Sequence, residues 1–216
     1  FKTSLEKSLF SSPAACIKSI EARLKKLYKK YTADDIKDIH LLENLKTALE
    51  AITPADFTRY QKLLDLLRGK EYAWNPADSG DRVVIFTERI ETMKYLAERL
   101  RQDLGLKANA IQEISGGMSD AEQQRIVEDF GRTESPVRVL VASDVAAEGL
   151  NLHYLSHRLI HFDIPWSLMV FQQRNGRIDR YGQQKRPDIR YMLIECDNKR
   201  IKGDMRIIEI LITKEE

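Results

Sequence analysis

Apolar residues recur every three or four positions through the first third of the chain, which is the spacing of one face of a helix. The pair Ser12-Pro13 is typical of a helix start, and the apolar positions after it predict a helix to about Tyr31. A second helix is predicted over 33–51 and a third from Thr53-Pro54 onward. We therefore expect residues 1–70 to form an all-helical segment.

The pattern changes near residue 80. Residues 71–81 collect turn formers and lack periodicity, so we predict that they form a linker. Strands are then predicted at 83–86, 107–113, 137–142, 158–162 and 188–194, and helices at 88–103, 120–130, 167–181 and from 198 onward. This alternation is typical of an α/β domain, here 82–216, in which helices cover both faces of a mainly parallel sheet and ligands bind at the carboxyl ends of the strands.

The composition is that of a globular domain without a membrane partner. Hydrophobic residues make up 43% of the 216 positions, enough for a sizeable core. The longest apolar runs are far shorter than the ~20 residues of a membrane span, and the first ten residues do not resemble a signal peptide. We therefore expect a cytoplasmic location. The 35 basic and 33 acidic residues leave a net charge of +2, so nucleic-acid binding has to be inferred from local clusters.

The cysteines and histidines lack the spacing of a metal site. Cys16 and Cys196 lie far apart and are predicted to be free thiols. His153, His157 and His161 are spaced by four, which would align them on a helix, but the residues around His161 are predicted to form a strand. We therefore predict no metal ligands in this chain.

The most informative segment is FQQRNGRIDRYGQ at 171–183. On a helix, Gln173, Arg177 and Arg180 would share one face, and Gly176 would remove bulk beside it. Two aligned guanidinium groups suit the oxygens of a phosphate. For a basic helix in general, the alternative is an exposed face held by salt bridges.

This segment resembles motif VI of superfamily 2 helicases, which has the pattern Gln-x-x-Gly-Arg-x-x-Arg. Its ending, Arg180-Tyr181-Gly182-Gln183, is similar to that of Swi/Snf-type remodelling ATPases and their bacterial RapA-like relatives. The resemblance implies a RecA-like three-layer domain that forms the second lobe of an ATP-driven motor. It also implies that Arg177 and Arg180 are arginine fingers for the γ-phosphate, with Gln173 and Gly176 beside the nucleotide.

The segment VLVASDVAAEGLNL at 139–152 resembles motif V of the same superfamily. An apolar strand would deliver Ser143 and Asp144 to the carboxyl edge of the sheet. By the resemblance, Ser143 contacts the nucleic-acid backbone, and the nucleotide contacts are Asp144, Gly149 and Asn151. The sequence departs from many RNA helicases at Glu148 and Asn151, where those proteins have arginine and aspartate.

Two shorter segments complete the order of the helicase motifs. Residues 83–87, ending at Thr87, resemble motif IV, and residues 114–119, which include Gly116, resemble the block that follows it. The resemblance implies that Thr87 and Gly116 contact nucleic acid. In the second block, Gln123 stands where relatives frequently have arginine.

The sequence lacks the other half of such an active site. No Gly-x-x-x-x-Gly-Lys-Ser/Thr phosphate loop and no Asp-Glu-x-His box occur, and Gly69-Lys70-Glu71 lacks the residues around it that a phosphate loop needs. The resemblance implies that ATP and Mg²⁺ are held mainly by a first RecA-like lobe of the same polypeptide. The chain by itself is therefore predicted to be inactive, and its other partner is predicted to be nucleic acid, double-stranded DNA by the Swi/Snf resemblance.

Three alternatives to a DNA translocase remain at this point. One is a helicase that separates strands, and another is a non-catalytic RecA-like scaffold. The third is a doubly wound enzyme acting on small molecules, which lacks a dinucleotide glycine fingerprint after 83–86. The helical residues 1–70 could be a bridge from the first lobe, a DNA-facing protrusion or a partner surface.

Overall fold

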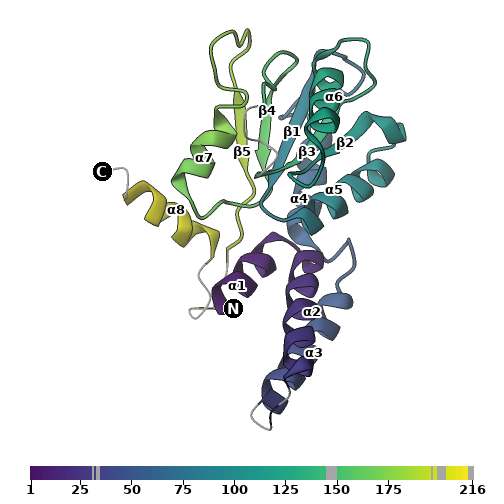
Figure 1. Ribbon diagram of the computed structural model, residues 1–216. Coiled ribbons are helices and arrows are strands. Elements are labelled where there is room, and N and C mark those ends of the chain that lie inside the picture. The colour runs from purple at the N-terminus through teal and green to yellow at the C-terminus, as the bar shows by residue number, and fades with distance from the viewer. Residues whose placement is uncertain (31, 33–34, 145–149, 196, 199–202, 214–216) are drawn as a thin grey trace.

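Five parallel strands form one sheet at the centre of the protein, as seen in the computed structural model (Figure 1). The structure describes residues 1–30, 32, 35–144, 150–195, 197–198 and 203–213. The strands are β1 (Arg82–Thr87), β2 (Ile111–Ile114), β3 (Val139–Ser143), β4 (Ser156–His161) and β5 (Asp188–Tyr191). Their order is β2-β3-β1-β4-β5, and each of the four pairings is parallel. The predicted α/β class is therefore confirmed.

Helices cover both faces of this sheet because its central strands are apolar on both sides. In β1, Val83 and Ile85 face one core, and Val84 and Phe86 face the other. The helices α4 (Thr58–Arg68) and α5 (Ile90–Asp103) close the first core, and α6 (Asp120–Gly131) closes the second. The three layers match the RecA-like architecture that the motif order implies.

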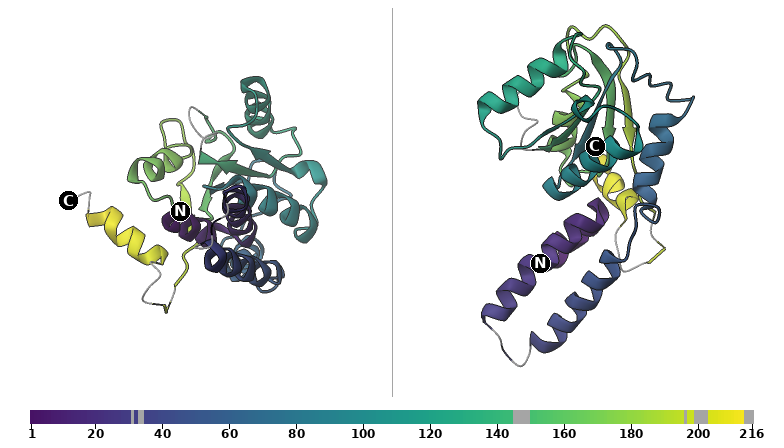
Figure 2. Two further views of the ribbon diagram at one scale, coloured as in Figure 1. Left: turned by 60° about the horizontal axis from the view of Figure 1, so that its bottom comes forward. Right: turned by 90° about the vertical axis from the view of Figure 1, so that its right-hand side faces the viewer.

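A helical arm extends from the carboxyl edge of the sheet (Figures 1 and 2). The helix α1 (Lys2–Ser11) leads into α2 (Pro13–Lys29) and α3 (Asp35–Glu50). We call the α2–α3 hairpin the arm; its interior includes Ile20, Leu24 and Leu42. The hydroxyl of Ser12 accepts from the amide of Ala15 at 3.1 Å, which is the predicted helix start. Cys16 is a buried free thiol, and burial raises its pKa to about 11. Cys196 lies outside the described residues.

The boundary between the helical and α/β parts differs from the prediction. The helix α4 packs in the core of the sheet through Tyr60 and Leu63, so it belongs to the α/β domain. Residues 71–81 do not form a free linker, because Tyr72 and Trp74 are buried in the same core. The α/β domain thus begins before α4 and not after residue 70.

Some predicted ends also shift. The third helix begins at Thr58 and not at Thr53, because the Asp56 carboxylate accepts from the amide and hydroxyl of Thr53 and closes a turn there. The last helix, α8 (Asp204–Thr213), begins later than the predicted 198. No helix among the described residues is both long enough and apolar enough to span a bilayer.

Candidate functional site

The segment that resembles motif VI begins as a helix but does not continue as one. The helix α7 (Leu168–Asn175) ends before Gly176, and the next residues form turns. Gln173, Arg177 and Arg180 therefore do not share a helix face, and the predicted helix to 181 is wrong. One cause is Ile178, which is fully buried in the second core of the sheet and draws the chain toward it.

The turns nevertheless bring the predicted nucleotide residues together. The Arg180 guanidinium donates to the side-chain oxygen of Asn151. The Arg177 guanidinium donates to the carbonyls of Gln173 at 3.0 Å and Leu150 at 3.4 Å. The carbonyl of Arg177 also accepts from the amide of Leu152 at 3.3 Å. The segments that resemble motifs V and VI are thus held side by side through Asn151, Arg177 and Arg180.

The three arginines of this segment have different surroundings. Arg174 is 1% exposed, and its guanidinium binds Asp144 at 2.5 Å and both the carbonyl (2.8 Å) and carboxylate (3.4 Å) of Asp163. Arg177 is half-buried, and Arg180 is exposed. Within the described ranges, Arg180 has no carboxylate partner. Arg180 can therefore meet an external anion, whereas Arg174 is committed to the protein.

Sequence reasoning missed Arg174 and its partner Asp163, and it gave Asp144 another role. Asp144 was predicted to contact the nucleotide, but it lies against Arg174, and burial raises the pKa of its carboxyl group. Asp163 follows β4 and is buried. Acids directly after two different strands, at Asp144 and Asp163, were the available signal, because buried carboxylates at one sheet edge require a cation.

Asp163 also gives Thr87 a structural role. The Asp163 carboxylate accepts from the hydroxyls of Thr87 and Ser11, each at 2.6 Å, and from the amide of Glu88 at 2.8 Å. Thr87 is fully buried and its hydroxyl already donates to Asp163, so its side chain has no group to offer to nucleic acid. The predicted nucleic-acid contact at Thr87 is therefore withdrawn.

The other predicted nucleic-acid residues lie at neighbouring strand ends. Ser143 ends β3, and Gly116 is exposed in the turn after β2, which pairs with β3. The Ser143 side chain is 3% exposed, and its hydroxyl has no hydrogen-bond partner among the residues with described positions. A buried hydroxyl without a partner is uncommon and is often satisfied by a ligand or water. Gly149 lies outside the described residues.

His161 is a core residue of β4. Its ring stacks on Phe171 and Tyr191, with centroids 5.0 and 4.8 Å away, and its Nε2 lies 2.8 Å from the side-chain oxygen of Asn175. Burial, reinforced by the charge of Arg174, lowers the pKa of His161 to about 3, so the ring is neutral at physiological pH. No cluster of three or more potential metal ligands occurs among the described positions.

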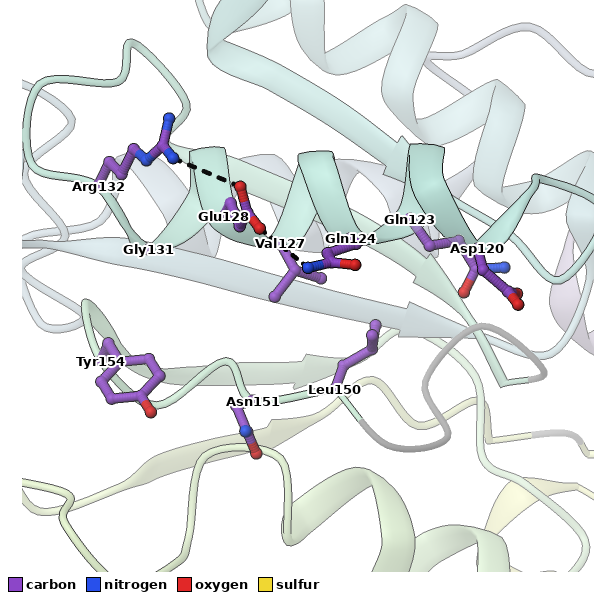
Figure 3. Close-up of a pocket in the computed structure, with 10 residues that line it drawn as sticks. All are labelled: Asp120, Gln123, Gln124, Val127, Glu128, Gly131, Arg132, Leu150, Asn151 and Tyr154. Atoms are coloured by element: carbon purple, nitrogen blue, oxygen red, sulfur yellow. Dashed lines mark hydrogen bonds and ion pairs between the residues drawn. The ribbon is translucent and has the colours of Figure 1, made fainter.

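A groove of about 610 Å³ adjoins this site between α6 and residues 150–154 (Figure 3). Gln123 and Val127 of α6 line one side, and Asn151 and Tyr154 line the other. Since Asn151 also accepts from Arg180, the groove and the arginine pair share a wall.

Replacing Gly176 with alanine tests whether a ligand needs the space beside the arginines. Gly176 has a φ of −63°, which alanine adopts readily, and an added Cβ would lie 3.4 Å from the carbonyl oxygen of Gln172, an ordinary contact. We expect G176A to keep or raise the free energy of unfolding, by about 0.4–1 kcal/mol, while a ligand that needs this space binds less tightly. Urea denaturation and titration with a nucleotide analogue measure the two effects. A loss of stability in G176A would contradict the expected fit.

Comparison with known families identifies the α/β part. The sequence pattern of the family described as "Helicase conserved C-terminal domain" matches residues 58–182, more than half of the chain. The match begins at the first residue of α4, which agrees with the place of that helix in the sheet core.

Individual relatives and structures are similar over part of their length. The RNA polymerase-associated protein RapA of Vibrio campbellii is 33% identical over 110 residues, covering 51% of this chain and 11% of RapA. RapA of Vibrio cholerae is 27% identical over 142 residues, covering 60% of this chain and 14% of RapA. The chain thus matches little more than a tenth of these relatives. The C-terminal part of the Fun30 ATPase domain has the same fold, with a TM-score of 0.53, 16% identity, and coverage of 81% of this chain and 67% of that one.

Proposed function

Because the chain belongs to the helicase conserved C-terminal domain family, we propose that it is the second RecA-like lobe of an ATP-driven nucleic-acid motor. The single observation that carries this proposal is the placement of the exposed Arg180 against Asn151, next to the contact between Arg177 and the carbonyl of Leu150. In this function, the two arginines act on ATP that is bound mainly by another lobe.

The arginine pair suits phosphoryl transfer. A guanidinium group is always charged, and its fork of donors matches phosphate oxygens. Charge that develops on the transferred phosphoryl group is stabilised by cations already in position. Arg180 is exposed and lies against a neutral amide oxygen, so an incoming phosphate can replace that contact without leaving a buried carboxylate unpaired. Gln173 and Gly176 lie next to this pair and are proposed nucleotide neighbours.

ATP and Mg²⁺ are proposed to be held mainly by a partner lobe that carries the phosphate loop. A nucleotide contact here is supported by the Arg180 guanidinium on the side-chain oxygen of Asn151 and the Arg177 guanidinium on the neighbouring carbonyl of Leu150. The residues of this chain do not fit the metal, since Asp144 and Asp163 already share Arg174. Held by the other lobe, Mg²⁺ would offset the charge of the phosphates.

Nucleic acid is the proposed substrate, and double-stranded DNA is the proposed form. The buried Ser143 hydroxyl, which has no partner in the described parts of the chain, and the exposed turn at Gly116 support a backbone contact at the ends of β2 and β3. The Arg180-Tyr181-Gly182-Gln183 ending, which resembles that of Swi/Snf-type ATPases, favours a duplex translocase over a helicase that separates strands. Stronger stimulation of ATPase activity by duplex DNA than by single strands tests this preference.

The chain alone is expected to hydrolyse ATP negligibly. No phosphate loop or acidic box occurs in its sequence, so ATP would lack most of its contacts and the metal would lack its ligands. Phosphate release should stay at the level of a no-protein blank, and joining the chain to a phosphate-loop lobe should produce Mg²⁺-dependent turnover. Robust turnover by the isolated 216 residues would refute the proposed division between two lobes.

A further inference from the structure

The helix α2 has an unbalanced charge. Its 17 residues include five basic side chains and a single acid, Glu21. Glu21 is already occupied, because Lys46 of α3 lies 2.9 Å from its carboxylate and holds its pKa below the usual value. The positive charge of α2 is therefore not offset within the helix itself.

Three of these basic residues form a straight line on the solvent side. Lys18, Lys25 and Lys29 are spaced by seven and four, which places them on one face of the helix, and all three are exposed. We call them the lysine stripe. At 1.5 Å per residue the stripe is roughly 16 Å long. None of the three lysines is ion-paired with a residue of the described ranges.

The stripe lies opposite the packed side of α2. Ile20, Leu24 and Leu27 are buried in the interior that α2 shares with α3, so the hairpin holds the lysines toward solvent. The lysines near the end of α2 also favour the helix through its dipole, by a few tenths of a kcal/mol each. That local effect does not explain Lys18, which lies in the first half of the helix.

The arm is fixed to the sheet edge where the candidate site lies. The hydroxyl of Ser12 is 2.7 Å from that of Thr92 in α5, and Ser11 donates to Asp163 at 2.6 Å. Beyond this junction, α2 and α3 project away from the α/β domain (Figure 2). The stripe is thus presented on a firmly attached extension of the carboxyl edge.

The chemistry of the stripe selects its ligand. An amphipathic membrane helix needs a free apolar face, and that face of α2 is buried. Protein interfaces are depleted in lysine and centre on apolar anchors, which the stripe lacks. Single-stranded nucleic acid is usually held by aromatic stacking, but the exposed ring nearest in sequence, Tyr28, donates its hydroxyl to Glu43 of α3. The phosphate backbone of a nucleic-acid duplex is a regular line of negative charges, and it matches the three lysines.

We propose that the lysine stripe of α2 is a second nucleic-acid contact of this chain and binds the phosphate backbone of double-stranded DNA. The identity of the ligand rests on the proposed function, whereas the site rests on Lys18, Lys25 and Lys29. Ammonium groups on a rigid helix contact phosphates without reading bases, so the contact is independent of sequence. The arm would thereby position the duplex relative to the carboxyl edge.

The test measures binding of this chain to a fluorescent 20-base-pair DNA duplex by anisotropy across a salt series. The variant K18Q/K25Q/K29Q removes the three charges and keeps good helix formers. We expect roughly tenfold or more weaker binding at about 0.1 M salt, and a slope of log K against log salt that is shallower by about 2 to 3. Circular dichroism melting checks that the variant remains folded.

A matched control removes the same charge elsewhere. The variant K62Q/K94Q/K107Q changes three exposed lysines on α4, on α5 and after α5. Its slope of log K against log salt should stay within about 1 of the wild-type value. Equal losses in both variants, or wild-type binding by the stripe variant, would overturn the proposal. So would binding to phosphatidylserine vesicles that exceeds binding to the duplex.

A second measurement separates this inference from the proposed function. In the complete protein, the stripe variant should keep the ATPase rate measured without DNA, and more duplex should be needed for half-maximal stimulation. If ATP turnover does not need Arg177 and Arg180 but the stripe variant still binds the duplex more weakly, the motor proposal fails and the DNA contact of the lysine stripe stands. If the stripe variant needs no more duplex than the wild type for half-maximal stimulation, only the DNA contact of the lysine stripe is contradicted.

Discussion

Replacing Arg180 or Arg177 with alanine is expected to lower kcat for ATP hydrolysis by the complete two-lobe protein by roughly 10³–10⁵-fold, the range found for arginine fingers. The reason is that each guanidinium would offset charge that exists fully only in the transition state, so binding of ATP should change much less than turnover. Steady-state phosphate release gives kcat, and equilibrium titration with a nucleotide analogue gives the affinity.

The control for this experiment is R186A, which removes an exposed arginine in the loop before β5. It should keep kcat within about twofold, since surface substitutions away from a site change little. The variant R180K should have a kcat between those of R180A and the wild type, because an ammonium group lacks the planar fork of a guanidinium group. Wild-type turnover in both R177A and R180A would support a non-catalytic scaffold and exclude the finger role.

Replacing Arg174 with methionine is expected to destabilise the protein by about 3–5 kcal/mol, the usual cost of removing one partner of a buried ion pair. Arg174 is 1% exposed and contacts two carboxylates, so its loss leaves Asp144 and Asp163 close together without a cation. Urea denaturation of the isolated chain measures the change. A few kcal/mol is a large part of the stability of a domain, and R174M is expected to unfold partly or fully at 37 °C.

The variants R180A and R174M should differ in stability. R180A should leave the free energy of unfolding unchanged within about 0.5 kcal/mol, because the Arg180 side chain is exposed. R174M should lose stability whether or not a second lobe is present. If R174M were as stable as the wild type, the assignment of Arg174 to the fold and Arg180 to the ligand would be wrong.

The centre of the sheet could be predicted because β1 and β3 are apolar. Residues 83–86 and 139–142 are buried on both faces, and turn formers or charged helices separate them in the sequence. The end of α7 could not be predicted in the same way. The sequence 167–181 has a helical pattern, but Ile178 is buried in the second core of the sheet, a tertiary placement that no local pattern reports.

The domain boundary was misplaced for a related reason. Residues 71–81 contain a proline, a glycine and two aspartates, as a linker would, yet Trp74 donates to the carbonyl of Asp81 at 2.9 Å inside the core. The Asp81 carboxylate binds Arg158 of β4 at 2.7 Å. A segment can therefore have the composition of a loop and still be fixed by two buried aromatic rings and an ion pair.

The candidate site was predicted unevenly. The neighbourhood of Arg180 and Asn151 followed from motif resemblance, and the structure brings these residues together. The sequence shows Asp163 only as an acid at a strand end, because its hydrogen bonds to Thr87, Ser11 and Glu88 join it to residues more than 70 positions away. Long-range polar networks of this kind depend on the fold and have no periodic signature.

The shared carboxylate of Asp163 limits how the protein can be shortened. A chain trimmed to begin at α4 would lose Ser11, and with it one of the groups that shield this acid from water. Arg59 would lose its hydrogen bond to the carbonyl of Phe10 and, among the described residues, keep its ion pair with Asp204. A minimal α/β fragment should therefore retain residues 10–12 or carry compensating substitutions, even though the rest of the hairpin has an interior of its own.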